Sequence, residues 1–435
     1  MPQPERRRVL LAGRDDLFDE VGTALEQAGA EVRALKDPRD DEVQEALRTR
    51  PDAVCAVARD DALPLRLALL VRHVDGEVPL VATVFDDEMA AQLQQAVPHM
   101  ELTSMADVVA PALAGPCLSA DLLAAWPDGD DVIGIRAEGE ELTGDRREKP
   151  STSIPRALAT SIFAPYDRSA RLLFYGLMGL VLMLGIETVG TMTVLDQSFA
   201  DALYGSTKSL VTVGPNTAVD DGPAWFKVAV VVAMVLTLFS AACFTGGLIE
   251  RLTSTRLTGL IGQRAVPRRD HVVVVGLGQV GMRLCLLLRE CGIAVVALEA
   301  DGEDESVGQA RRLKLPVVIG KGANPQVMRR LSLDRARALA AVTEDDLTNI
   351  ESAMTARSVN PDLRVILRAG AGGVAEESRS LLRIGHVIDV QRIAGVFIAA
   401  RTLGEQVTGV VPVADGVHLL LPGGGDERFP PGHRS

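Results

Sequence analysis

Three glycines in the second half of the chain have the spacing of a phosphate-binding loop. The GxGxxG stretch comprises Gly276, Gly278, Gln279, Val280 and Gly281. The apolar run 271–275 before it predicts a buried strand, and the run 282–290 after it predicts a helix. Glycines let the backbone approach a ligand closely, and a helix N-terminus presents free N–H groups. This loop therefore predicts a site for a pyrophosphate.

An acidic side chain follows the glycines at the distance expected of a ribose-binding group. Glu299 ends the next predicted strand, about 20 positions after the loop. There a carboxylate can accept hydrogen bonds from ribose hydroxyls. We therefore expect an adenine nucleotide, NAD(H), ADP or ATP, bound as a regulatory ligand and not as a catalytic one. The alternative is a Rossmann sheet whose site stays empty.

A second stretch with unusual chemistry, Asp201 to Trp225, lies between two long apolar runs. It contains the sequence TVGPN, formed by Thr212, Val213, Gly214, Pro215 and Asn216. Backbone carbonyls in such a turn can replace the water around a permeating ion. Pro215 keeps its carbonyl but has no N–H group and a fixed φ, and Asn216 tolerates positive φ. The stretch is therefore a candidate ion filter with an atypical outer half.

The two apolar runs that flank this stretch are long enough to span a membrane. They cover 172–193 and 224–248, and a bilayer core requires about 20 residues. Acidic residues predominate in the loop between them, and basic residues flank the pair. The basic residues are Arg146, Arg147, Lys149, Arg156, Arg168 and Arg171 before the first run, and Arg251, Arg256, Arg264, Arg268 and Arg269 after the second. The positive-inside rule then places both termini in the cytoplasm and the TVGPN stretch outside.

Composition excludes several classes of function. The formal net charge of −13 argues against a nucleic-acid binder. The five cysteines include no CxxC pair, which indicates reduced thiols and no metal site. The six histidines are scattered, and no acid, base and nucleophile cluster together, so we expect no enzyme. GxGxxG alone would permit a membrane-anchored oxidoreductase, but no substrate domain is evident.

The N-terminus repeats the glycine-loop unit. Residues 6–35 align without gaps on 269–298, and Gly13 falls on Gly276. The first copy has lost the site residues: Asp15 replaces Gly278, Phe18 replaces Gly281 and Lys36 replaces Glu299. A side chain as large as phenylalanine at the phosphate position argues against binding. We therefore expect a structural first copy and a ligand-sensing second copy.

These patterns predict an α-helical two-span membrane pore domain plus two α/β Rossmann-like cytoplasmic domains. The expected divisions are an N-terminal Rossmann-like lobe at 1–125, a linker at 126–165, a two-helix pore domain with a re-entrant loop at 166–265, a C-terminal Rossmann lobe at 266–405 and a tail at 406–435. The linker is acidic and rich in Gly, Pro and Ser, with a short hairpin expected around 132–142. The end of the tail, from Pro422, reads as disordered.

Two spans, a loop with Thr-Val-Gly and a GxGxxG domain after the second span together resemble the ligand-gated potassium channels with RCK domains (regulators of potassium conductance, TrkA-N-like). The stretch SFADALYGSTKSLVTVG resembles their pore helix and filter entry, and GGLIERL resembles the end of their inner helix. The resemblance covers roughly 166–403. It implies a homotetramer in a bacterial cell membrane, a central pore, and a cytoplasmic ring of Rossmann lobes that acts on the inner helices when ligand binds.

Three departures from the family pattern matter. The family filter continues with an aromatic residue, glycine and aspartate, where this chain has Pro215, Asn216 and Thr217. Lys208 lies on the expected pore helix, where a cation repels permeating cations unless it is neutralised. Glu187, near the end of the first span, is the expected partner, because an ionisable residue in a membrane is costly unless paired. Lys321 stands where many family members have an aspartate, and it could attract phosphate or indicate that the pocket binds a different ligand.

The sequence thus predicts a nucleotide-regulated channel that conducts a cation, potassium among the candidates, through a tetrameric pore in contact with lipid. The rival interpretation is a non-conducting, membrane-bound nucleotide sensor that kept the architecture and lost the filter. Pro215, Asn216 and Lys208 favour the rival.

Overall fold

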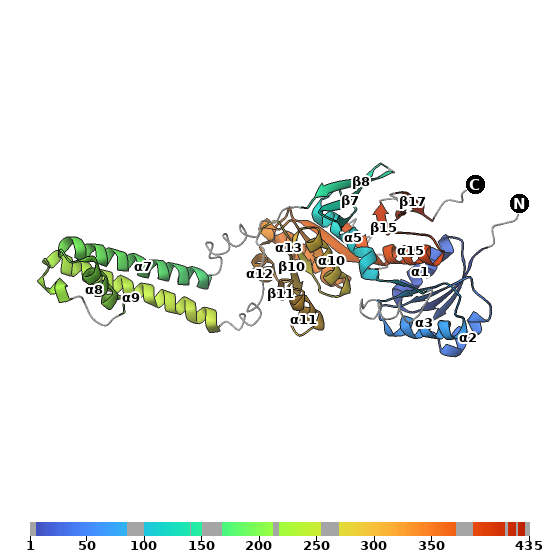
Figure 1. Ribbon diagram of the computed structural model, residues 1–435, viewed down its shortest axis with the longest axis horizontal. Coiled ribbons are helices and arrows are strands. Elements are labelled where there is room, and N and C mark those ends of the chain that lie inside the picture. Colours follow the sequence, from blue (N-terminus) through green and yellow to red (C-terminus); the bar gives the residue numbers. More distant parts are fainter. Residues whose placement is uncertain are drawn as a thin grey trace. The chain divides into compact units, whose positions relative to one another are not determined.

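The computed structural model divides the chain into two compact units (Figure 1). The first comprises 1–152 and 263–435, and the second comprises 153–262. The structure describes residues 6–84, 100–139, 141–149, 168–211, 217–253, 269–370, 386–413, 416–422 and 425–430. The second unit is therefore an insertion, in sequence, within the first.

The first unit begins with a five-stranded parallel sheet in the order β2-β1-β3-β4-β5. Its elements are β1 (Arg8–Gly13), α1 (Asp15–Gln27), β2 (Glu31–Lys36), α2 (Asp40–Leu47), β3 (Ala53–Val57), α3 (Ala62–Val74), β4 (Leu80–Thr83) and β5 (Met100–Thr103). One apolar cluster lies on each face of this sheet. A central strand such as β3, with every residue buried, is continuously apolar because helices cover both faces.

A second parallel sheet, of six strands, follows the insertion in the order β11-β10-β9-β12-β13-β14. Its strands are β9 (His271–Val275), β10 (Ala294–Glu299), β11 (Val317–Ile319), β12 (Ala338–Ala341), β13 (Arg364–Ala369) and β14 (His386–Asp389). Its helices are α10 (Gln279–Glu290), α11 (Glu305–Arg312), α12 (Pro325–Arg330), a short 3₁₀ turn η3 (Leu333–Arg335) and α13 (Asp346–Val359). The predicted α/β Rossmann-like architecture of this lobe is confirmed.

The two lobes exchange helices. α5 (Met105–Leu118) follows the N-terminal sheet but packs on α10, and α15 (Val390–Thr402) follows the C-terminal sheet but packs on α1. Gly395 of α15 lies so close to α1 that an added Cβ would stand 3.1 Å from the Cβ of Glu20. One apolar cluster runs through both lobes, from Val9 to Phe429. The lobes therefore share part of one core.

Two small antiparallel sheets complete the first unit. One is formed by β6 (Ala124–Asp128), β7 (Asp131–Glu138) and β8 (Glu141–Glu148), and the other by β15 (Gly409–Val413), β16 (Gly416–Leu420) and β17 (Asp426–Phe429). The hairpin expected around 132–142 corresponds to β7 and β8, which pair antiparallel and extend to 131–148. The sequence predicts a tail from 406, where the structure has β15, β16 and β17; these strands have only four or five residues each, too few for a clear alternating pattern.

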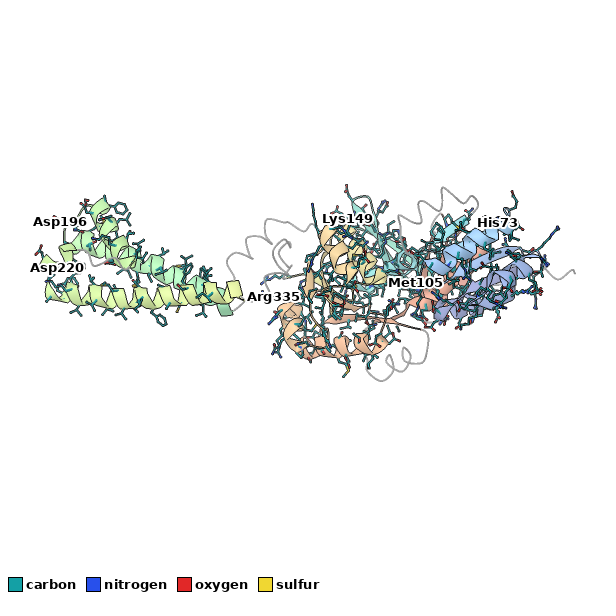
Figure 2. The ribbon with its side chains drawn as sticks, turned by 90° about the horizontal axis from the view of Figure 1, so that it is seen from below. His73, Met105, Lys149, Asp196, Asp220 and Arg335 are labelled. Atoms are coloured by element: carbon teal, nitrogen blue, oxygen red, sulfur yellow. The ribbon has the colours of Figure 1, made fainter. Side chains whose placement is uncertain are left out.

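The second unit contains two long helices, α7 (Arg168–Val194) and α9 (Ala224–Thr253), with the shorter α8 (Phe199–Leu210) and a 3₁₀ turn, η1 (Thr217–Asp221), between them. Gly176 and Gly179 let α7 approach α9 closely, because a Cβ at Gly176 would lie 2.5 Å from the backbone nitrogen of Phe244. Figure 2 shows Asp196 and Asp220 together at the end of the unit where α7 finishes and α9 begins.

Both long helices are long and apolar enough to cross a membrane, over Leu172–Val194 and Ala224–Ile249. Within the chain, 17% of the apolar window is buried in α7 and 11% in α9. A core helix of a soluble protein is mostly buried, so the exposed apolar faces of α7 and α9 are unlike those of such a helix.

Candidate functional site

The glycine loop joins β9 to α10 in a conformation that only glycine adopts easily. Gly276 has φ +94°, in the region that disfavours side chains. At Gly281 a Cβ would stand 1.9 Å from the carbonyl oxygen of Gly276, so the helix can begin this close to the strand only because that position lacks a side chain. The first and third glycines thus set the shape of the loop.

The N-terminus of α10 is open to an anion. The helix begins after Gly278, whose position would leave an added Cβ in open space, and its first turn contains no acidic residue. Gln279 and Gly278 are exposed, whereas Val280 and Gly281 are buried. The free N–H groups of this turn and the helix dipole favour a negatively charged group here.

Glu299 lies at the end of β10 and faces the loop. Its Oε2 accepts a hydrogen bond of 2.8 Å from the backbone N–H of Leu277, and its Oε1 accepts one of 2.7 Å from that of Ala300. The carboxylate therefore fixes the loop to the neighbouring strand. It is half-buried, so its remaining lone pairs can still accept bonds from a ligand hydroxyl.

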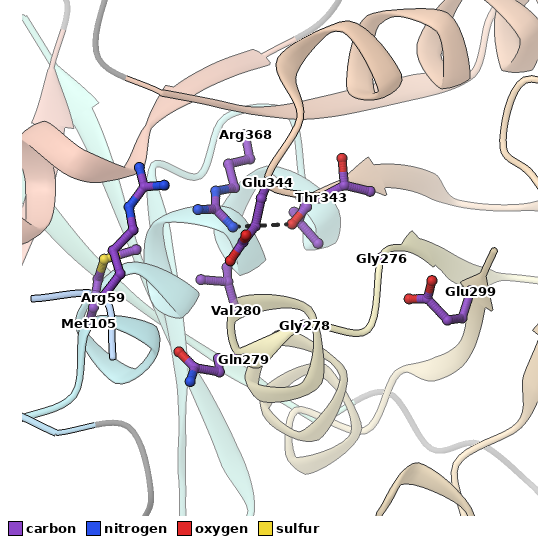
Figure 3. Close-up of a pocket in the computed structure, with 11 residues that line it drawn as sticks. Arg59, Met105, Gly276, Gly278, Gln279, Val280, Glu299, Thr343, Glu344 and Arg368 are labelled. Atoms are coloured by element: carbon purple, nitrogen blue, oxygen red, sulfur yellow. Dashed lines mark hydrogen bonds between the residues drawn. The ribbon is translucent and has the colours of Figure 1, made fainter. Parts of the chain in front are cut away.

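These residues line a cavity of about 190 Å³ (Figure 3). The lining residues are Arg59, Met105, Gly276, Gly278, Gln279, Val280, Glu299, Val342, Thr343, Glu344 and Arg368. Arg59 and Met105 come from the N-terminal lobe, at the end of β3 and the start of α5. The cavity is therefore built by both lobes, although the glycine loop belongs to the second alone.

Arg368 places a buried positive charge beside the glycine loop. Its side chain leaves the end of β13 and is 8% exposed, and its Nη1 lies 3.4 Å from the carbonyl oxygen of Val342. Burial lowers the pKa of Arg368, the charge of Glu344 raises it, and the charge of Arg59 lowers it further. A bound anion would relieve this unfavourable environment.

Lys321, which the sequence predicts to attract phosphate, is not among the residues that line the cavity. It is exposed on the loop between β11 and α12, where its carbonyl accepts a hydrogen bond of 3.0 Å from the N–H of Asn324.

The predicted filter residues Thr212, Val213, Gly214, Pro215 and Asn216 lie outside the described residues. The two pore-associated residues are described, and they do not form the predicted ion pair. Lys208 places its Nζ 5.7 Å from the centre of the Tyr204 ring.

Glu187 is 7% exposed on α7, and its Oε1 has no hydrogen-bond partner among the described residues. The physical reason is the helical period. Glu187 of α7 lies beside Ser209 of α8, and the preceding residue Lys208 is rotated about 100° away around the helix.

The TrkA-N domain family matches residues 272–388. This match covers most of the C-terminal lobe, which we call the TrkA-N lobe. Potassium channel protein 1 of Methanocaldococcus jannaschii is 21% identical over 201 residues, which is 45% of this chain and 60% of the relative. The voltage-gated potassium channel Kch of Escherichia coli is 26% identical over 222 residues, 48% of this chain and 51% of the relative. The chain is thus similar to potassium channels, as its sequence predicts, and it spans about half to three-fifths of these relatives.

Among solved structures, the GsuK channel superposes with a TM-score of 0.51 at 15% identity, covering 93% of this chain and 65% of that one. At this identity the match supports the fold alone.

The structure adds to the TrkA-N lobe several lining residues that sequence reasoning missed. Arg59, Met105 and Arg368 matched no motif. One sequence pattern could have indicated Arg59. The internal repeat aligns Arg59 with Glu344, and the two residues lie in the turns that follow β3 and β12. The strands that these turns follow have equivalent central positions in the two sheets.

Proposed function

We propose that the chain is a subunit of an ion channel whose TrkA-N lobe binds an adenine nucleotide as a regulatory ligand. One observation carries this proposal: a cavity at the GxGxxG loop, with Glu299 beside it and a helix N-terminus free of acidic residues, lies in a chain that also has two candidate membrane spans. NAD(H), ADP and ATP each supply a ribose for Glu299 and a pyrophosphate for α10.

The pore of this proposal is formed by four copies in a cell membrane, with both termini in the cytoplasm and TVGPN at the outer constriction. Potassium is the first candidate ion, because both curated relatives are potassium channels. The exposed apolar faces of α7 and α9 suit contact with lipid and with further copies of the unit.

Ion flux into liposomes that contain the purified chain tests conduction. We expect cation flux, compared for potassium, sodium and caesium and set against chloride, to change when NAD, ADP or ATP is added on the cytoplasmic side. The control is Gly278→Asp, which places a carboxylate at the helix N-terminus and should remove the nucleotide response while leaving basal flux intact. Flux in the parent that no nucleotide alters would contradict regulation at this site.

A non-conducting nucleotide sensor is the second candidate. Lys208 favours it, because among the described residues the contact of this cation is with the Tyr204 ring, 5.7 Å from its centre, and not with a carboxylate. Absence of flux both in the parent and in a variant with Pro215→Tyr and Asn216→Gly would select the sensor, provided that nucleotide still binds.

A further inference from the structure

Arg59 reaches the nucleotide cavity from the lobe that has lost its own glycine loop. It follows β3 as Glu344 follows β12, and both residues line the same cavity. The two equivalent turns of the internal repeat therefore face each other across the site. One contributes a cation where the other contributes an anion.

Packed elements, and not a loop alone, hold Arg59 in this place. α5 of the N-terminal half packs on α10, and Asp107 of α5 forms an ion pair with Arg283 of α10. Met105 is 3% exposed and belongs to the same apolar cluster as Val280. The edge of the N-terminal lobe is thus anchored beside the glycine loop.

The guanidinium of Arg59 has unfilled hydrogen-bonding capacity. Its Nη2 donates to Oδ2 of Asp16 over 3.2 Å, in a pair in which the Arg59 side chain is 33% exposed. Its Nε is buried with no hydrogen-bond partner among the described residues. A buried donor without a partner costs free energy that a bound anion would recover.

Arg59 and Arg368 lie together at one end of the site. Figure 3 shows them on one side of the glycine loop and Glu299 on the other. If the ribose lies at Glu299 and the pyrophosphate at Gly278, the ligand ends between the two arginines. Glu344 and Asp16 offset the two positive charges, so a terminal phosphate would bind here by competing with these carboxylates for the guanidinium donors.

We propose that Arg59 completes the nucleotide site by binding the distal phosphate of ADP or ATP, so that the N-terminal lobe contacts the ligand bound by the TrkA-N lobe. This inference rests on the proposed nucleotide binding. It gives the degenerate lobe a direct part in recognition. The cavity of about 190 Å³ is below the roughly 300–1,000 Å³ typical of whole-ligand pockets. That size suits phosphates, with the adenosine beyond Glu299.

Calorimetric titration of the full chain with AMP, ADP, ATP and NAD tests the proposal. We expect Arg59→Gln to weaken ATP and ADP binding about tenfold or more, the effect of losing a charge-assisted hydrogen bond, and to leave AMP binding unchanged. Arg59→Lys, which keeps the charge but loses the planar fork, should fall between Arg59→Gln and the parent. The matched control is Arg33→Gln, which removes an exposed arginine of β2 in the same lobe.

A double-mutant cycle adds a test with the opposite sign. Asp16 competes for the Arg59 guanidinium, so Asp16→Asn should tighten ATP binding in the parent but not in Arg59→Gln.

Two results overturn the inference while leaving the proposed function intact. In the first, Arg59→Gln and Arg33→Gln bind ATP equally well. In the second, the parent binds NAD but neither ADP nor ATP. If the parent binds no nucleotide and its titration equals that of Gly278→Asp, the proposed function fails and the inference fails with it.

Discussion

The two Rossmann-like lobes have similar parallel sheets but use the turn after the first strand in opposite ways. In α10 the first turn is free of acidic residues, whereas α1 begins with Asp15 and Asp16. Asp15 has φ +72°, and its Oδ2 accepts a hydrogen bond of 3.2 Å from the N–H of Arg59. The N-terminal lobe thus places its own carboxylates where the TrkA-N lobe leaves room for a ligand.

Phe18 and Lys36 complete this difference. The Phe18 ring is 5% exposed and takes the position of Gly281, where any side chain would meet backbone in the TrkA-N lobe. Lys36, at the position of Glu299, pairs with Asp19 over 2.8 Å and lies 5.8 Å from the Phe18 ring centre. The two lobes thus have similar sheets and differ at three positions, two in the first turn and one at the end of the neighbouring strand β2.

The largest expected effect comes from a methyl group at Gly281. Gly281→Ala puts a Cβ 1.9 Å from the Gly276 carbonyl oxygen, so loop and helix must separate. We expect the free energy of unfolding to fall by about 3 kcal/mol, the upper part of the range for overpacking. Denaturant titration measures this loss. Gly278→Ala is the matched control, because its Cβ meets open space and should change stability by less than about 0.5 kcal/mol.

Gly278→Asp copies Asp15 into the TrkA-N lobe and should remove ligand binding without unfolding it. A ligand at 100 times its Kd stabilises a protein by about 2.7 kcal/mol, and we expect the variant to lose this increment because its carboxylate repels phosphate. Thermal unfolding with and without ATP measures it. Gly278→Asn keeps the shape without the charge and should retain more of the increment. Equal stabilisation of Gly278→Asp and the parent would contradict the assignment.

Gly395→Ala tests how tightly α15, the helix that packs on the N-terminal lobe, contacts α1. The added Cβ would stand 3.1 Å from atoms of Glu20, so we expect a loss of about 1 kcal/mol. The control is Gly308→Ala in α11, whose Cβ meets nothing nearer than the Arg312 guanidinium at 4.0 Å and should stabilise by about 0.5 kcal/mol. If both substitutions stabilise, the lobes pack more loosely than described.

The smallest expected effect is a difference in acid sensitivity between the lobes. His271 starts β9 at the position of Arg8 in β1. It is fully buried, and its Nε2 lies 2.9 Å from the carbonyl oxygen of Leu331. Burial lowers the pKa of His271, so the unfolded chain binds the proton more tightly. Stability is then complete above the unfolded pKa of about 6.5 and declines as pH falls below it.

Replacing His271 by glutamine removes the titrating group and keeps a donor for Leu331. We expect the His271→Gln variant to lose less stability than the parent between about pH 7.5 and about pH 5.5, measured by urea unfolding. His73→Gln, at an exposed position of α3, is the control and should follow the parent. A parent and a His271→Gln variant with the same pH dependence would show that this histidine does not contribute.

The sequence predicts those parts of the site that depend on residues close together in the chain or on neighbouring strands. The strand, glycine loop and helix around Gly278 are contiguous, and Glu299 reaches the loop because β10 is the neighbour of β9 in the sheet. No local pattern predicts that Arg59 lines this cavity. Its position depends on α5 and α15 each packing against the other lobe, and α5 contains Pro111 and Pro116, which weaken its helical signal.

The failed ion pair has a different cause. Glu187 and Lys208 were matched by their expected depth in the membrane, and depth says nothing about direction. One residue along α8 decides which side chain faces α7, and that residue is Ser209, which is 5% exposed. A prediction of pairing needs the rotation of each helix, which packing sets and hydropathy does not.

The exchange of α15 also has a consequence for synthesis. The surface of α1 around Glu20 is covered by Val390–Thr402, which leaves the ribosome only after both candidate membrane spans. The nascent N-terminal lobe therefore lacks α15 on this surface until residues 390–402 have been made, and the surface is open meanwhile to chaperones or to the α15 of another copy. The first lobe is therefore completed only after all six strands of the second lobe have been made.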